Sequence, residues 1–80
     1  MKWHKMYFSG ENTKQHDSDH IEYYYNDAGY RIYVNYTDFR HNKVYCYNVK
    51  VPNGTGSVGY KTLAEAQHTV RVMMEGIRCL

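Results

Sequence analysis

The sequence predicts an α+β fold, in which a three- to four-stranded antiparallel sheet carries one C-terminal amphipathic helix packed on one face. Three observations lead to this prediction. Apolar and polar residues alternate with a period of two between residues 21 and 61, turn-forming residues interrupt the alternation, and residues 62–77 switch to helical spacing. Eighty residues form one domain. We divide it into an N-terminal strand and polar loop (1–20), an antiparallel meander (21–61) and the helix (62–77).

The N-terminal third of the chain predicts a strand, a loop and a hairpin. Residues 1–8 alternate loosely and fit either a short strand or a helical turn, whereas the polar stretch 9–19 is typical of a loop. In the next expected strand, Ile21, Tyr23 and Tyr25 share one face. Residues 26–29 then have turn chemistry, because Asn and Asp tolerate unusual dihedral angles and Gly adopts positive φ.

The alternation is clearest in the two strands that follow. In the first, one face carries Tyr30, Ile32, Val34 and Tyr36, and the other carries Arg31, Tyr33 and Asn35. After a polar connection, residues 44–51 place Tyr45, Tyr47, Val49 and Val51 opposite Val44, Cys46, Asn48 and Lys50. The turn-forming run 52–56 separates this strand from a short last strand over 57–61.

The start of the helix is the best-specified local feature. Thr62 and Glu65 have the spacing of a capping box, in which the Thr hydroxyl accepts a hydrogen bond from the Glu amide. Apolar residues then recur at helical spacing as far as Ile77. The predicted core consists of Ile32, Val34, Val49, Val51, Leu63, Ala66, Val70, Met73 and Ile77.

Charge and cysteine content suggest the setting in which the protein acts. Residues 9–29 carry five acidic side chains against Lys14, and residues 30–61 carry five basic ones against Asp38, so the molecule is expected to be dipolar. Two cysteines do not make a disulfide scaffold. The chain contains no apolar run of the length of a signal peptide or a membrane span. We therefore expect a cytoplasmic protein without a membrane partner.

The sequence contains no specific catalytic or metal-binding motif. Cys46 with a histidine is a conceivable Cys–His pair, but no flanking motif supports it, and the 53–57 loop lacks the Lys-Ser/Thr of a phosphate-binding loop. The run from His16 to His20 has metal-ligand residue types, yet its polar surroundings favour a solvated loop. We predict that the protein is not an enzyme and has no cofactor or metal.

Tyrosine is the most informative residue type, with ten residues, most of them between Tyr23 and Tyr60. Tyrosine offers contact area at low entropic cost. We therefore predict a small non-catalytic binding protein that uses a Tyr-rich sheet surface, and its partner is predicted to be another protein. The predicted partner-binding residues oppose the expected core face: Tyr24, Arg31, Tyr33 and Asn35. The alternative is a DNA- or RNA-binding sheet that uses Arg31, Tyr33, Asn35, Asn48 and Lys50.

The order hairpin, third strand, turn and Gly59-Tyr60-Lys61-Thr62-Leu63-Ala64-Glu65-Ala66 resembles the three-stranded, helix-backed DNA-binding module at the N-terminus of many tyrosine recombinases. The arrangement is also similar to that of the plant AP2 domain. The resemblance covers residues 21–77 and implies that the sheet enters the major groove with Arg31 and Lys50 on the DNA. This chain departs from the family in its few basic residues and many tyrosines.

In style, the chain also resembles small proteins encoded by phages and mobile elements. That resemblance implies an inhibitor of a host system as one version of the protein-binding function. A small core and an exposed aromatic edge favour pairing, so a homodimer is a further expectation.

Overall fold

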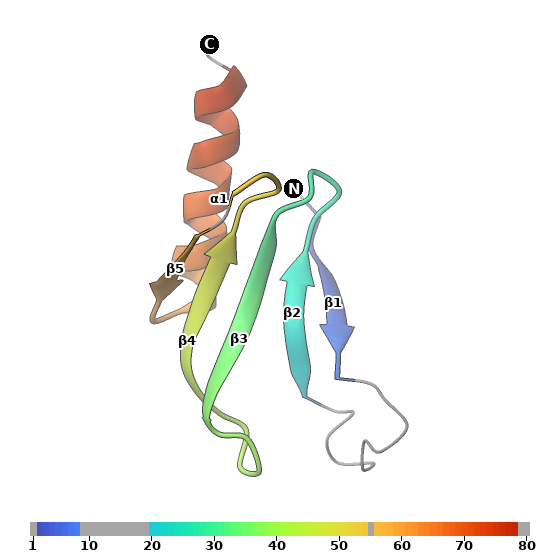
Figure 1. The fold of residues 1–80 in the computed structure, drawn as a ribbon, viewed down its shortest axis with the longest axis vertical. Coiled ribbons are helices and arrows are strands. Elements are labelled where there is room, and N and C mark those ends of the chain that lie inside the picture. Colours follow the sequence, from blue (N-terminus) through green and yellow to red (C-terminus); the bar gives the residue numbers. More distant parts are fainter. Residues whose placement is uncertain (1, 9–19, 55, 79–80) are drawn as a thin grey trace.

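A computed structural model describes residues 2–8, 20–54 and 56–78, which form an antiparallel sheet of five strands and one helix (Figure 1). The strands follow one another across the sheet in chain order. Their bounds are His4–Tyr7 (β1), Ile21–Tyr25 (β2), Arg31–Asp38 (β3), Lys43–Lys50 (β4) and Ser57–Tyr60 (β5), and the helix is Leu63–Arg78 (α1). The α+β class is confirmed. The α1 helix lacks the length and apolar content that crossing a membrane requires.

The sheet has five strands rather than the expected three or four, because the N-terminal segment forms β1 and pairs with β2. His4 lies opposite Tyr25, and Met6 lies opposite Tyr23. The register shifts between Met6 and Tyr7, which marks a bulge. The loose alternation of residues 1–8 allowed a strand or a helical turn, and only the pairing with β2, which lies more than a dozen residues away in sequence, selects the strand.

The turn between β2 and β3 is organised by one buried side chain, Asn26. Its Oδ1 accepts hydrogen bonds from the amides of Ala28 and Tyr30, both at 3.1 Å. Gly29 has φ of +92°, a conformation that side chains with a Cβ rarely adopt. A Cβ at this position would also lie 3.2 Å from Cγ of Pro52. The turn chemistry predicted for residues 26–29 is therefore present. The side chain of Asn26 joins the end of β2 to the residue that precedes β3.

The register between β3 and β4 corrects one part of the predicted alternation. Asn35 pairs with Cys46, but Tyr36 pairs with Val44, so Tyr45 is the extra residue of a bulge. Tyr45 is 71% exposed. Val44 and Tyr47 both line a groove on the helix side of the sheet. The prediction that Tyr45 and Tyr47 share a face opposite Val44 was wrong, because a bulge changes the phase of the alternation.

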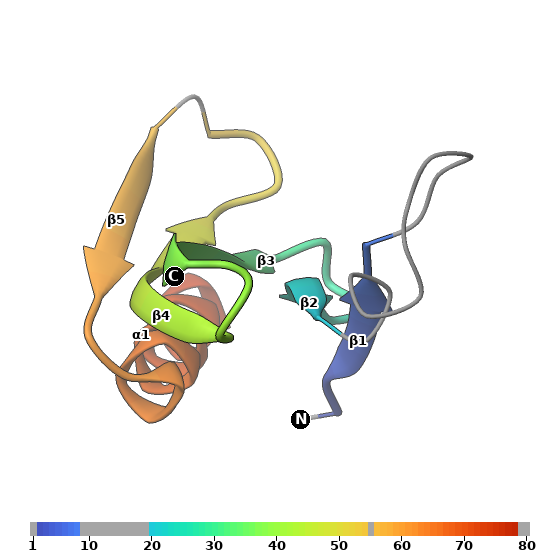
Figure 2. The ribbon, with the colours of Figure 1, turned by 90° about the horizontal axis from the view of Figure 1, so that it is seen from below.

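The helix packs on one side of the sheet, over β4 and β5 (Figure 2). Two of its residues, Ala66 and Val70, are completely buried against a cluster that contains Tyr30, Ile32 and Val49. Complete burial of a side chain of the size of Val70 contributes about 1.5–3 kcal/mol. Of the predicted core, Val34 is also buried, while Val51, Leu63 and Met73 are partly buried against the cluster. The side chain of Ile77 lies outside the described part of the structure.

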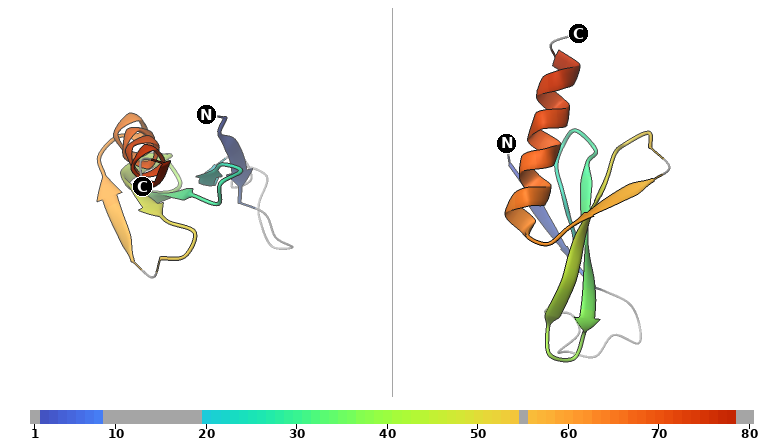
Figure 3. Two further views of the ribbon diagram at one scale, coloured as in Figure 1. Left: turned by 90° about the horizontal axis from the view of Figure 1, so that it is seen from above. Right: turned by 90° about the vertical axis from the view of Figure 1, so that its left-hand side faces the viewer.

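The helix begins where the capping pattern predicted. The Thr62 hydroxyl accepts a hydrogen bond of 3.1 Å from the amide of Glu65. From this cap, α1 runs along β4 and β5 and leaves the β1 edge of the sheet uncovered by any described helix (Figure 3). One face of the sheet therefore holds the core, and none of the residues that the structure describes forms a helix over the other face.

Candidate binding face

The side of the sheet that faces away from α1 is the candidate binding surface. Successive side chains of a strand point to opposite faces, so the neighbours of the buried Ile32 and Val49 point away from the helix. The cross-strand pairs extend this assignment over four strands. We call this surface the open face and define it by His4, Met6, Tyr23, Tyr25, Arg31, Tyr33, Asn35, Cys46, Asn48 and Lys50.

Aromatic rings form a continuous row on the open face. The Tyr23 ring lies 5.0 Å from the Tyr33 ring and 6.0 Å from the Tyr25 ring, between centroids. The ring of His4 lies 5.0 Å from that of Tyr25. These separations are in the range of favourable aromatic pairs. The row crosses β1, β2 and β3. Contacts between neighbouring rings therefore order these side chains in the unbound protein.

Arg31 adds a positive charge to this row. Its guanidinium carbon lies 5.0 Å from the centroid of the Tyr23 ring, and its Nη1 donates a hydrogen bond of 3.0 Å to the Tyr33 hydroxyl. That hydrogen bond raises the pKa of Arg31, so the group stays charged. Lys50 lies directly opposite Arg31 in the β3–β4 ladder. None of the ion pairs within residues 2–8, 20–54 and 56–78 involves Arg31 or Lys50.

Two amides and a thiol continue the open face toward β4. The Asn35 side-chain amide donates to the Cys46 sulfur at 3.6 Å, and the Cys46 thiol donates to the side-chain Oδ1 of Asn48 at 3.5 Å. Gly59 lies opposite Asn48 on β5, where a Cβ would come within 2.8 Å of Asn48 Oδ1. The missing side chain at Gly59 therefore leaves room for Asn48. Cys46 is held by neutral amides in this arrangement.

The structure brings together most of the residues predicted to bind, with one exception. Arg31, Tyr33, Asn35, Asn48 and Lys50 all lie on the open face. Tyr24 does not, because it pairs with Ile32 and packs against the helix-side core. Burial there raises the pKa of Tyr24. Its predicted place beside the other three partner-binding residues was wrong.

Five residues of the open face were not among the predicted site residues: His4, Met6, Tyr23, Tyr25 and Cys46. Ile21, Tyr23 and Tyr25 were predicted to share one face, and only the two tyrosines do so. Ile21 lines the helix-side groove with Tyr24, because the register shift between β1 and β2 leaves Glu22 as the extra residue of a bulge. The repeated tyrosines did not show which of the two faces is the open one. His4 and Met6 join the face only through the pairing of β1 with β2. No local sequence pattern predicts the pairing of β1 with β2.

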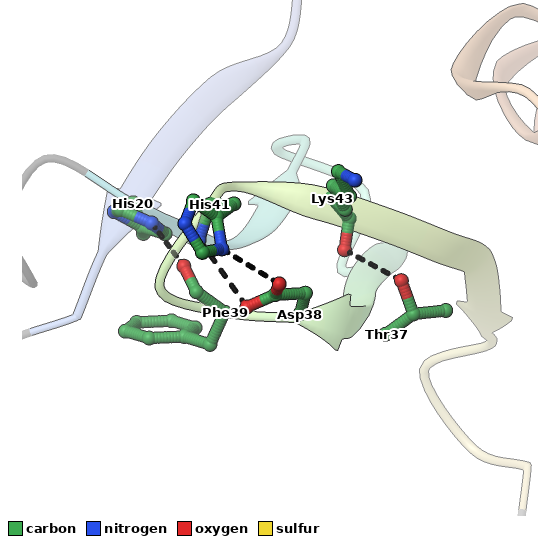
Figure 4. Close-up of polar contacts among 6 residues, drawn as sticks. All are labelled: His20, Thr37, Asp38, Phe39, His41 and Lys43. Carbon is green, nitrogen blue, oxygen red and sulfur yellow. Dashed lines mark hydrogen bonds and ion pairs between the residues drawn. The ribbon is translucent and has the colours of Figure 1, made fainter.

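A second polar cluster surrounds the turn between β3 and β4, at the far end from the helix (Figure 4). Nε2 of the buried His20 lies 2.6 Å from the carbonyl oxygen of Phe39, and its ring lies 4.3 Å from the Phe39 ring. Asp38 accepts a hydrogen bond of 2.7 Å from Nδ1 of His41, which lowers the pKa of Asp38. These contacts tie the start of β2 to the turn, and we assign the cluster a structural role.

The predicted solvated loop with its metal-ligand residue types falls mostly outside the described residues, which include only His20 of that run. Within the described ranges, no three His, Cys, Asp or Glu side chains gather in a way that suits a metal ion. The open face is thus the one surface where several predicted site residues meet in a defined geometry.

Comparison with known proteins adds no family to this geometry. No protein-family model matches the chain, and neither the curated proteins nor the solved structures give a match.

Proposed function

We propose that this chain is a small non-catalytic binding protein that recognises a protein partner through its open face. The observation that carries the proposal is the cluster of Tyr23, Arg31 and Tyr33, in which the rings and the guanidinium group hold one another in place. Tyrosine and arginine are enriched among the residues that dominate binding energy at protein interfaces. Because the cluster is ordered by its own contacts, binding has less side-chain entropy to remove.

The charges beside the cluster indicate which kind of protein surface it would bind. Arg31 and Lys50 lie side by side across two strands and make no ion pair with a described residue, so an acidic patch complements them. The amides of Asn35 and Asn48 supply polar contacts at the margin. In its most concrete form, the protein is a phage- or mobile-element-encoded inhibitor that covers an acidic surface of a host enzyme.

Site-specific photo-crosslinking tests this proposal. A photoreactive phenylalanine analogue replaces Tyr33 on the open face, and the matched control carries it at Tyr45, which is 71% exposed on the bulge. In extract of the host cell, the analogue at position 33 should give a discrete protein adduct that is resistant to nuclease. The analogue at position 45 should give no such adduct. Adding Arg31→Glu should abolish the adduct, because it places a like charge against an acidic partner. Equal crosslinking from both positions would reject the open face as the binding surface.

A second candidate function is nucleic-acid binding through the same face, and the Arg31–Lys50 pair next to a row of rings favours it specifically. Here the cations contact phosphates and the rings of Tyr23 and Tyr33 stack on unpaired bases. In a salt titration with single-stranded and duplex probes, Arg31→Ala and Lys50→Ala should each lower the salt slope by about one unit. Lys43→Ala, an exposed lysine at the other end of β4, is the control. Absence of binding by every probe at low salt would eliminate this candidate.

A further inference from the structure

The two edges of the sheet are built differently, and this difference points to a contact between two copies of the chain. The sheet ends at β1 on one side and at β5 on the other. An edge strand presents unpaired amides and carbonyls, and proteins commonly protect such an edge with a lysine or a bulge. β1 has both, in Lys5 and in the register shift after Met6.

The β5 edge has neither form of protection. Its residues are Ser57, Val58, Gly59 and Tyr60, and its register with β4 is regular. Val58 pairs with the buried Val49, so its side chain is on the helix side of the sheet, yet it is 55% exposed. The helix that buries Val49 does not cover Val58. An apolar side chain is therefore left at the open edge of the sheet, beside backbone groups that can accept another strand.

The helix flank above this edge is also poor in charge. The flank of α1 toward β1 forms an open groove with Trp3 and includes His68, Arg71 and Glu75. Residues on the opposite flank follow at helical spacing and include Thr69, Val72 and Gly76. Val72 is 52% exposed, and a Cβ at Gly76 would meet no other part of the described structure within 4 Å beyond its chain neighbours and the adjoining helix backbone. This flank is open and carries no charge from Thr69 to Gly76, and the exposed Glu65 lies one turn before Thr69 on the same flank.

We propose that β5 pairs in antiparallel fashion with β5 of a second copy, which joins the two sheets about a twofold axis. Such an axis, perpendicular to the sheet, keeps both helices on the same face, and twofold dimers are the commonest oligomers. Two registers preserve the alternation of faces. One centres on Val58, and the other centres on Gly59 and sets Val58 against Tyr60, an aromatic and β-branched pair. Neither register places like charges opposite one another, so the strand is complementary to itself.

A stable dimer needs more buried area than one short strand pair provides. A stable interface buries roughly 800 Å² on each partner, which a four-residue strand cannot supply alone. In the proposed dimer, the flank with Thr69 and Val72 therefore contributes part of the buried area. The open face lies on the other side of the sheet and remains available in the dimer, so this proposal stands independently of the function proposed above.

Sedimentation equilibrium from low micromolar to submillimolar concentration tests the proposal. The wild-type chain should approach twice its mass of 9.5 kDa. Val58→Lys should keep it at the mass of one chain, because the two lysines face each other at the axis in one register and replace the Val58–Tyr60 apolar contact in the other. Val58→Thr, which keeps the branched side chain, should still dimerise. Met6→Lys adds the same charge at the β1 edge, where Met6 is 38% exposed, and should leave the dimer intact.

Other results of the same experiment would contradict the β5 dimer. A wild-type chain that stays monomeric at the highest concentration overturns the proposal, and so does a Val58→Lys variant that still dimerises. Dissociation by Met6→Lys alone would assign the contact to β1 instead. Circular dichroism of each variant confirms that it is folded, and Val72→Lys supplies a second test of the same interface should Val58→Lys fail to fold.

Discussion

At the scale of single residues, tyrosine occupies three distinct environments in this sheet. Tyr24 packs in the helix-side core, Tyr33 lies on the open face with its hydroxyl bonded to Arg31, and Tyr45 projects from a bulge. The side chain tolerates all three because its ring is apolar and its hydroxyl can reach water or a partner. Composition alone therefore identifies an aromatic sheet without saying which face any one ring belongs to.

The Asn26 turn provides a sharp test at this scale. Asn26→Ala removes the acceptor of two amide hydrogen bonds, a partly buried one from Ala28 and a buried one from Tyr30. We expect a loss of about 1–3 kcal/mol, because each bond contributes about 0.5–1.5 kcal/mol. Chemical denaturation measures the change. The control is Asp27→Ala at a side chain that is 88% exposed, which should change stability by less than about 0.5 kcal/mol. Equal effects of the two substitutions would contradict the role of Asn26.

Tyr36 links stability to alkaline pH. Its hydroxyl donates a hydrogen bond of 2.6 Å to the carbonyl of Ile21, and burial raises the pKa of Tyr36 above the usual 10.0. Since the folded state holds the proton more tightly, this contribution is complete below pH 10.0 and is lost as the pH rises through the higher folded pKa. Tyr36→Phe should cost about 0.5–1.5 kcal/mol at neutral pH and flatten the alkaline loss of stability.

Denaturation at a series of pH values measures that slope. Tyr45→Phe, on the exposed bulge, is the control and should retain the wild-type slope. Burial also raises the pKa of Tyr24, so part of the slope should persist in Tyr36→Phe. An unchanged slope in Tyr36→Phe would contradict the assignment.

At the scale of elements, the sequence specified those whose signals are local. The capping pattern at Thr62 and Glu65 located the start of α1, and the alternation of Ile32 and Val34 identified the core face of β3. The run Tyr23-Tyr24-Tyr25 gave no such information, because identical side chains in both phases leave the face undetermined. The β1–β2 pairing and the bulge at Tyr45 depend on contacts between strands, which no local pattern encodes.

The packing of α1 yields a prediction with a matched pair of substitutions. Val70 is completely buried and Val72, two residues later, is 52% exposed. Val70→Asp should unfold the domain, because it buries a carboxylate without a partner among Ile32, Val49 and Tyr30. Val72→Asp should change monomer stability by less than about 0.5 kcal/mol. Thermal melts at low protein concentration measure both, and a melt unchanged by Val70→Asp would refute the packing of the helix.

At the scale of the whole molecule, the helix covers β4 and β5, and the hairpin of β1 and β2 is attached to β3 by a short ladder. Amide hydrogen exchange should therefore be slowest in the central strands β3 and β4, around Ile32 and Val49, and faster in β1 and β5. Mass spectrometry of overlapping peptides, or two-dimensional NMR, measures these rates. Protection of β1 equal to that of β3 would show that the hairpin is more firmly anchored than its ladder implies.

The position of Trp3 gives the protein a built-in optical reporter. It is the single tryptophan in a chain with ten tyrosines, and it lines the groove beside α1 together with His68 and Met74. Its emission wavelength therefore senses whether the β1 end of the sheet and the helix remain together. Energy transfer from tyrosines such as Tyr24 to the Trp3 indole depends on the distance between their rings. Its efficiency therefore also reports whether the strands that carry these residues stay together. One unlabelled sample can thus report helix docking and sheet integrity by fluorescence.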